Sequence, residues 1–285
     1  MNTRDIKGRI KSVTNIKQIT EAMKLVAAAR LRKAEEKAKG ARPYAEKIEE
    51  LIRRASAAAP DFTSPLFRQG EVKKTGYLII SSDKGLAGAY NSNVMKMTMS
   101  QIAGKDPASY AVSVCGKQAR NYLKFRGYEL DAYRFGFSDK PTALEAREVA
   151  REITQWFLRE EVDEVYIIYT KFYTALRQEV TMGKLLPIEA PAGEAEGELQ
   201  QDYMFLPDAA EVFSKLLPEY IEVQIYSAML QSAASELGSR MAAMSAATDN
   251  AAERIADLNL SYNKARQAQV TNEISEIVGG ANALE

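Results

Sequence analysis

The chain has 285 residues, enough for one large domain or two ordinary ones, and with 46% hydrophobic residues it has the material for a core. Its 38 Lys and Arg balance 38 Asp and Glu, so no overall charge draws it to nucleic acid or anionic lipid. His is absent and Cys115 is the only cysteine, which argues against a catalytic site, a metal site or a disulfide. No apolar run reaches the roughly 18 residues that span a bilayer, and the N-terminus lacks a signal-peptide core, so we expect a soluble protein.

A long helix is predicted from Thr3 to about Ala59, since this segment consists of strong helix formers interrupted only by Gly40 and Pro43. Apolar residues recur there at steps of three or four, which predicts one buried face: Ile6, Ile10, Val13, Ile16, Ile19, Met23 and Val26. Residues 1–40 hold eleven Lys or Arg against four Asp or Glu, so the remaining faces are basic.

Residues 72–206 show a different pattern, in which short apolar runs alternate with helical stretches. Buried strands are predicted at 77–81, 111–115 and 164–169, and helices at 88–103, 116–125 and 141–160, with Trp156 in the core. This alternation predicts an α/β domain with a mostly parallel sheet flanked by helices. Segments 178–188 and 203–207 add one or two strands. Residues 189–211 contain seven acidic and no basic side chains, which indicates a solvated loop.

A second long helix is predicted from about 208 to the end of the chain, with Pro218 marking a kink or the boundary of a short leading helix. Steps of four and three alternate along it, as in a left-handed coiled coil: Leu237, Met241, Met244, Thr248, Ala251, Ile255, Leu258, Tyr262 and Ala265. A helix of this length, on the order of 95 Å, needs a long partner.

The N-terminal helix is the candidate partner within the chain, which predicts three segments: a helix at 1–59, the α/β domain at 72–206 and a helix at 208–285. The two helices would form a left-handed antiparallel hairpin, in which the numbers of paired residues sum to about 265 to 280, as the helix rise requires. The alternative is that each helix pairs with a second copy of the chain.

The segment from Ser81 to Gly88 follows a strand and precedes a helix, where many α/β proteins bind a nucleotide phosphate. It matches neither G-x-G-x-x-G nor G-x-x-x-x-G-K-[ST], so we favour a structural turn with Asp83 as a cap and glycines at positive φ. Cys115, inside an apolar strand, is expected to be a buried hydrophobe rather than a nucleophile. The spacing of the acidic residues in 189–211 matches no calcium loop.

Four segments resemble, in the correct order, the gamma subunit of bacterial F-type ATP synthases. They are RIKSVTNIKQITEAMKLVAAARLRKA (9–34), SDKGLAGAYN (82–91), SRMAAMSAATDNA (239–251) and VTNEISEIVGGANA (270–283).

The resemblance implies a central rotor shaft that couples proton translocation to ATP synthesis and hydrolysis and is itself non-catalytic, with no cofactor. It also implies one copy per complex, with the alpha and beta subunits of the catalytic hexamer, the epsilon subunit and the c-subunit ring as partners. The location would be peripheral, at the cytoplasmic face of the bacterial cell membrane. Nucleic acid is not an expected partner.

The resemblance further implies which residues contact the partners: Met23, Lys24, Arg240, Arg266, Gln267, Thr271 and Glu273. Met23 and Lys24 would meet the moving acidic segment of a catalytic subunit, and Arg240, Arg266 and Gln267 the loops that grip the shaft. Two other classes of protein remain open, a free-standing α/β nucleotide-binding enzyme and a homodimeric coiled-coil adaptor.

Overall fold

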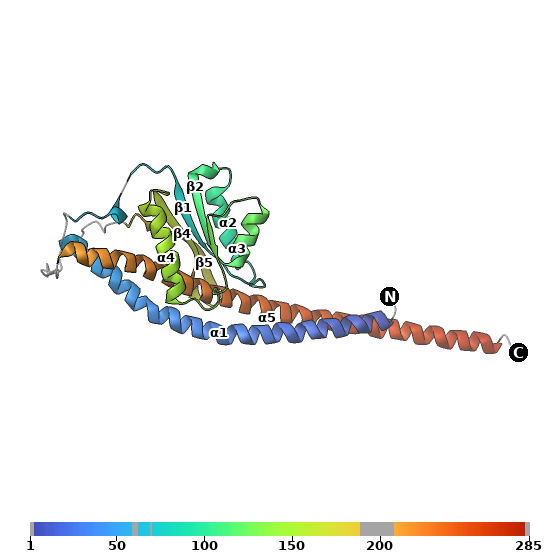
Figure 1. Ribbon diagram of the computed structural model, residues 1–285. Helices are drawn as coiled ribbons and strands as arrows, with labels where there is room; N and C mark the ends of the chain where they lie inside the picture. Colours follow the sequence, from blue (N-terminus) through green and yellow to red (C-terminus); the bar gives the residue numbers. More distant parts are fainter. Residues whose placement is uncertain (1–2, 59–61, 69, 189–207, 283–285) are drawn as a thin grey trace. The chain divides into compact units, whose positions relative to one another are not determined.

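A computed structural model describes residues 3–58, 62–68, 70–188 and 208–282 (Figure 1). The chain divides into two compact units, the first formed by Met1–Ala27 with Met241–Glu285 and the second by Ala28–Arg240. Helices α1 (Thr3–Ala58) and α5 (Ala209–Asn282) contribute to both units. Both long helices are therefore confirmed, and Pro218 lies inside α5 rather than at its boundary.

The second unit contains a five-stranded sheet in the order β3-β2-β1-β4-β5. Strands β1 (Thr75–Ile80), β2 (Tyr110–Cys115), β3 (Ala132–Arg134) and β4 (Glu164–Thr174) are parallel, and β5 (Arg177–Leu186) is antiparallel to β4. The predicted mostly parallel sheet is confirmed. Sequence analysis did not predict β3, because its three residues are not buried and form no apolar run. The strand predicted at 203–207 and most of the acidic segment lie outside the described residues.

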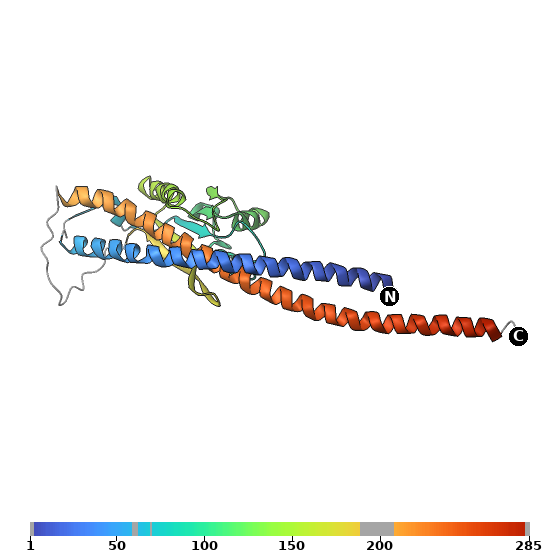
Figure 2. The ribbon, with the colours of Figure 1, turned by 90° about the horizontal axis from the view of Figure 1, so that it is seen from below.

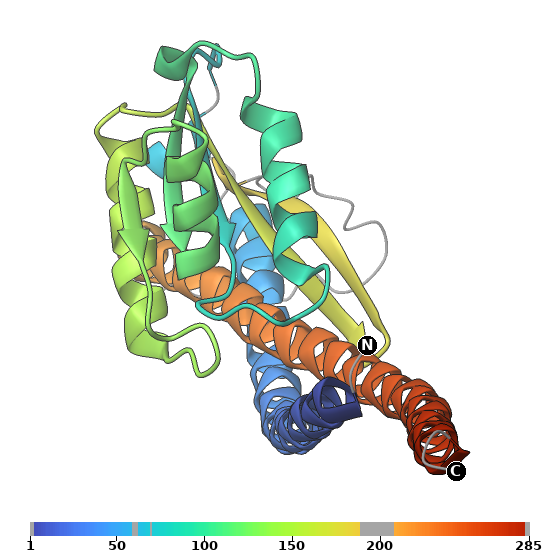
Figure 3. The ribbon, with the colours of Figure 1, turned by 90° about the vertical axis from the view of Figure 1, so that its right-hand side faces the viewer.

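Helices cover both faces of this sheet. Helices α2 (Tyr90–Ile102) and α3 (Lys117–Phe125) pack on one face, and α4 (Ala143–Leu158) and the first part of α5 pack on the other. Figure 3 shows α2 and α4 on opposite sides of β1 and β2. Short 3-10 helices span Pro65–Phe67 and Pro107–Ser109. The alternation along β1 sends Tyr77 and Ile79 toward α2 and α3, and Leu78 and Ile80 toward α4 and α5.

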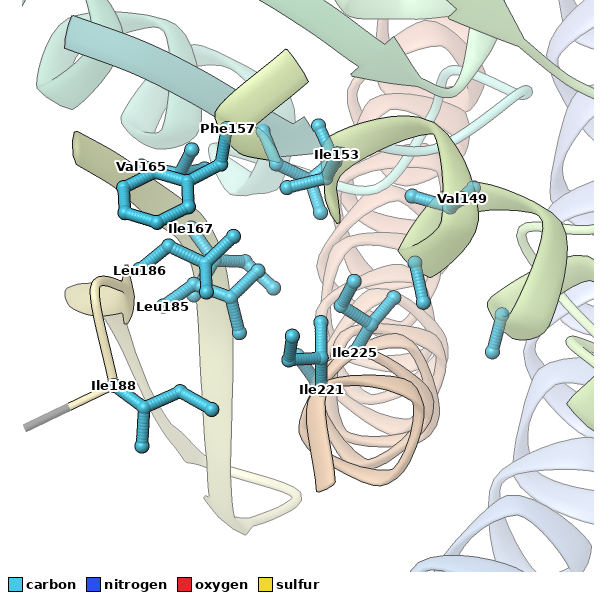
Figure 4. Close-up of a cluster of buried hydrophobic side chains, with 14 of the residues drawn as sticks. Val149, Ile153, Phe157, Val165, Ile167, Leu185, Leu186, Ile188, Ile221 and Ile225 are labelled. Atoms are coloured by element: carbon cyan, nitrogen blue, oxygen red, sulfur yellow. The ribbon is translucent and has the colours of Figure 1, made fainter. Parts of the chain in front are cut away.

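The larger apolar cluster joins α5 to the sheet (Figure 4). Ile221 and Ile225 of α5 point toward Ile167 of β4 and Leu185 of β5, and α4 closes the cluster with side chains that include Phe157. All five side chains are at most 6% exposed. Each Å² of apolar surface removed from water stabilises the fold by about 25 cal/mol. The burial of these side chains therefore holds the first part of α5 against the sheet.

The first unit is an antiparallel pair of helices (Figures 1 and 2). The hydroxyls of Thr20 and Thr248 lie 2.8 Å apart, and Thr3 donates a hydrogen bond of 3.1 Å to Gln269. Both pairs fall within the predicted range of residue sums, so the hairpin is confirmed. The predicted seam of α5 is buried or half-buried along its whole length.

The predicted stripe on α1 is partly wrong. Ile16, Ile19 and Val26 are 51%, 59% and 53% exposed, while Thr20 and Ala27 are buried. A step of three residues falls about 60° short of a full turn, so three such steps in succession from Ile10 carry Ile19 to the opposite face. No helix in the described part of the chain is long and apolar enough to cross a membrane.

Candidate partner interface

The turn after β1 carries Asp83, whose carboxylate binds three backbone amides. Asp83 accepts hydrogen bonds from the amides of Lys117 (3.0 Å), Gly136 (2.8 Å) and Ser138 (3.2 Å). Lys117 is the first residue of α3, so Asp83 caps the N-terminus of α3 and not that of α2, the helix that follows the turn. The predicted capping role of Asp83 is present, and that the turn is purely structural stays a prediction. The positive φ angles of the turn lie at Leu86 (60°) and Gly88 (55°), not at Gly85.

Two further observations concern the cysteine and the acidic side chains of the described residues. Cys115 is 2% exposed, and burial raises the pKa of its thiol to about 12, so it is the small buried hydrophobe that was predicted. The described residues contain no cluster of three or more His, Cys, Asp and Glu side chains arranged to hold a metal ion.

Met23 and Lys24 lie on α1 within the first unit and are half-buried. The ammonium of Lys24 is 3.7 Å from the carboxylate of Glu21, one turn earlier. The next two residues, Leu25 and Val26, are 61% and 53% exposed. This stretch of α1 thus presents a cation beside large apolar side chains.

Arg266, Gln267, Thr271 and Glu273 are all exposed on the last turns of α5. The hydroxyl of Thr271 donates to the carbonyl of Gln267 at 2.9 Å, and the amide of Gln269 donates to Glu273 at 2.9 Å. These bonds run along the helix and leave the side chains on its surface.

The end of α5 continues past its partner helix. Thr3, the first described residue of α1, pairs with Gln269, so the segment Val270–Asn282 extends about 20 Å beyond it (Figure 2). This segment carries apolar side chains with little cover, since Ile274 is 56% exposed and Ile277 72%.

We call the exposed apolar side chains of the first unit the shaft surface. Its members are each between 47% and 72% exposed: Ile16, Ile19, Leu25, Val26, Leu260, Val270, Ile274, Ile277 and Val278. The sequence analysis did not single out this surface as a binding site. The available signal was the set of apolar residues that fall outside the heptad seam, such as Leu260 beside Leu258.

Arg240 differs from the other six predicted contact residues because it is buried within the second unit. Its side chain is 9% exposed, forms an ion pair with Glu236 and donates a hydrogen bond of 3.1 Å to the carbonyl of Gly85. Sequence analysis expected Arg240 to meet the loops of a catalytic subunit, and its guanidinium is instead bound within the chain. The preceding turns of α5 pack closely on β4, where Ser232 and Ser235 bond to the backbone of Thr170, so this face of α5 is covered.

Burial also affects Glu236, whose side chain is 3% exposed. Desolvation raises the pKa of its carboxyl to about 7, against the opposing attraction of Arg240. One carboxylate oxygen of Glu236 has no hydrogen-bond partner among the described residues.

Comparison with known proteins identifies the family. A family model described as ATP synthase matches residues 2–284. The gamma chain of Desulfitobacterium hafniense ATP synthase is 45% identical over 284 residues, covering 100% of this chain and 99% of the relative. That of Heliobacterium modesticaldum is 45% identical over 288 residues, with 99% and 98% covered. The chain belongs to the ATP synthase gamma chain family.

The fold agrees with this membership of the gamma chain family. The rotor of Euglena gracilis mitochondrial ATP synthase includes a chain that aligns with a TM-score of 0.68 at 16% identity, covering 94% of this chain and 98% of that one. A chain from the central stalk and c-ring of the Tetrahymena thermophila mitochondrial enzyme aligns with a TM-score of 0.65 at 22% identity, with 80% and 99% covered. At these identities the likeness concerns the fold.

Proposed function

We propose that the chain is the central rotor shaft of an F-type ATP synthase, which couples proton translocation to ATP synthesis and hydrolysis by rotating. Family membership supports the role, and the shaft surface is the observation that carries it. Large apolar side chains that share one helix face and remain in water mark interaction sites, and Val270, Ile274, Ile277 and Val278 recur at such a spacing on α5. Nine such side chains on a two-helix hairpin are best explained by a surrounding protein collar.

In this proposal the alpha and beta subunits surround the first unit, and the epsilon subunit and the c-subunit ring contact the second. One copy serves each complex, at the cytoplasmic face of the bacterial membrane. The segments 1–59, 72–206 and 208–285 would be its functional parts. A shaft with unlike faces presents a different surface to each of three identical catalytic sites, so it holds them in different conformations and exchanges these on rotation. The shaft contributes no reacting group.

Six residues retain their proposed contacts with the catalytic subunits: Met23, Lys24, Arg266, Gln267, Thr271 and Glu273. All are exposed or half-buried in the first unit. Cationic side chains among apolar ones favour acidic partner segments over a wide range of angles, because charge attraction acts over about 8 to 10 Å at physiological salt. Direct contact by Arg240 is left out, since its guanidinium is bound within the chain.

Arg266→Glu tests this assignment. Arg266 is exposed, so the reversal should change the free energy of unfolding by no more than about 0.5 kcal/mol. At a partly dry interface the same reversal should cost on the order of 2 to 5 kcal/mol. We therefore expect folded chains whose assembled complexes hydrolyse ATP but pump protons poorly, as measured in membrane vesicles.

Lys140→Glu is the control, because Lys140 is exposed in the second unit. Normal pumping by Arg266→Glu, or equal damage from Lys140→Glu, would show that Arg266 is merely solvated.

Co-purification separates the proposal from its rivals. A tagged copy should bring down alpha, beta and epsilon subunits in fixed proportion. A stable dimer of the isolated chain in sedimentation would support the adaptor instead. Saturable nucleotide binding by the isolated chain would support the enzyme.

A further inference from the structure

The turn 82–88 is fastened to α5 by a buried, charge-assisted contact. Arg240 reaches from α5 to the carbonyl of Gly85 at 3.1 Å, and Glu236, one helical turn earlier, holds the same guanidinium. Both side chains are at least nine-tenths buried. Hydrogen bonds that involve an ionised group are directional and roughly twice as strong as neutral ones.

The same turn is tied to α1 through a shared carboxylate. Asp139 lies 3.2 Å from the ammonium of Lys84 in the turn and 2.9 Å from the guanidinium of Arg30 in α1. All of these residues belong to the second unit. The turn is therefore linked to α5 directly, by Arg240, and to α1 through Asp139, which pairs with both Lys84 and Arg30.

The turn is also fixed to the sheet, since it continues directly from β1. The amide of Ser82 donates to the side chain of Asn91 at 3.1 Å, and the carboxylate of Asp83 binds three amides. Leu86 and Gly88 adopt positive φ, and for a non-glycine residue such as Leu86 the allowed region at positive φ is small. These bonds hold the turn rigidly at the end of β1, so a displacement of the sheet also displaces Gly85.

We propose that the turn 82–88 is a mechanical joint between the central sheet and α5, beside the bonds of Ser232 and Ser235 to β4, with Arg240 and Glu236 as its positioning residues. The apolar cluster between the sheet and α5 resists separation, but apolar attraction is not directional. The directional bonds that α5 makes to the sheet and its turn include those of the two serines to Thr170 of β4, which are neutral, and the charge-assisted bond of Arg240 to Gly85. Torque between a sheet and a helix is a sliding load. A directional bond between Arg240 and Gly85 opposes that load. This inference rests on the proposed rotor function.

Arg240→Ala in assembled complexes is the primary test. We expect ATP hydrolysis to stay within about twofold of the wild type, while ATP-driven proton pumping falls by about fivefold or more, as for residues that carry coupling between sites. Glu236→Ala should show the same split, and the double variant should lose little more, because the two residues act as one unit. Glu236→Gln keeps an acceptor for the guanidinium and should pump nearly as the wild type does.

Arg134→Ala is the matched control. Arg134 is half-buried and pairs with Glu148 and Glu152 of α4, so its removal also breaks ion pairs in the second unit without touching the turn or α5. Equal loss of pumping in Arg134→Ala would overturn the proposal. So would normal pumping in Glu236→Ala beside a loss in Arg240→Ala, which would mean that Arg240 acts on another subunit.

A second measurement covers variants that fail to assemble. Hydrogen exchange on the isolated chain should show faster exchange at residues 84–88 in Arg240→Ala, with β1 and β2 unchanged. Unchanged exchange in the turn would refute the joint. If the wild-type chain itself does not assemble with catalytic subunits, the rotor function fails instead, which co-purification detects separately.

Discussion

At the scale of single residues, Glu236 is a carboxyl group that the fold holds in an unfavourable place. The charged and titratable groups around it are Arg240 on its own helix, Lys84 in the turn, Asp139 in the following loop and Tyr90 of α2. Arg240 and Lys84 favour the ionised form, yet burial outweighs them and the pKa rises from 4.5 to about 7. The folded chain therefore holds this proton more tightly than the unfolded chain does.

This shift predicts a pH dependence of stability. The contribution of Glu236 to the free energy of unfolding is fully present below about pH 4.5 and is lost as the pH rises through about 7. Because each pKa unit corresponds to 1.36 kcal/mol, the loss amounts to about 3 kcal/mol. Glu236→Gln has no such proton. Urea unfolding of both proteins across this window should show the difference between them changing with pH. Parallel curves would contradict the assignment.

Arg240 also shows the limit of residue-level inference from sequence. A basic residue on a polar helix is usually solvated, and the sequence contains no direct sign that Gly85, more than 150 positions away, provides its acceptor. The useful signal was the Glu236 to Arg240 spacing of four, which permits an ion pair on one helical face. That spacing does not reveal whether the pair is buried.

At the scale of elements, predictions succeeded where the pattern was regular. The alternating steps of four and three on α5 keep a constant face, so every residue from Leu237 to Ala265 in that series is buried or half-buried. Strands β1 and β2 were predictable because all six residues of each are buried. On α1, consecutive steps of three rotate off the face, and β3 is too short to form a pattern.

Two leucines within one turn of α5, on opposite faces of the helix, separate folding from binding. Leu258 is 6% exposed in the seam, while Leu260 is 59% exposed on the shaft surface. Leu258→Ala should destabilise the hairpin by about 2 kcal/mol or more, because it removes buried contacts. Leu260→Ala should leave the hairpin intact and weaken its association with the catalytic subunits.

Hydrogen exchange of residues 250–265 in the isolated chain, together with the yield of assembled complex, measures the two effects. Equal behaviour of the two variants in both assays would show that the seam and the shaft surface are not distinct.

At the scale of the whole molecule, the two units should differ in stability. The second unit has apolar clusters on both faces of its sheet, whereas the first is a two-helix pair with hydroxyls in its seam. Long helices in water depend on packing for stability. In the isolated chain, β1, β2 and β4 should therefore exchange their amides far more slowly than residues 3–20 and 260–282. Uniform protection would contradict a shaft that its partners stabilise.

The two long helices and the α/β region between them were predictable from period and composition, as was antiparallel pairing, because both helices flank the same region. The domain bounds 1–59, 72–206 and 208–285 stay a prediction. The exposure of Ile16 and Ile19 was not predictable. In isolation an apolar residue is assumed to face the chain's own core. Only the placement of α5 beside α1 shows which of these residues remain uncovered.

The hydroxyls of Thr20 and Thr248 have a consequence for axial slip. Moving one helix past the other by a single turn, about 5.4 Å, would part the two hydroxyls and leave each with only the bond along its own helix, to the carbonyls of Lys17 and Met244. Polar residues at seam positions fix the alignment of paired helices in this way, at some cost in stability. If one helix of the hairpin slid along the other under torque, the length of the shaft would change during each rotation. The Thr20–Thr248 pair opposes this sliding and so keeps the length of the hairpin constant.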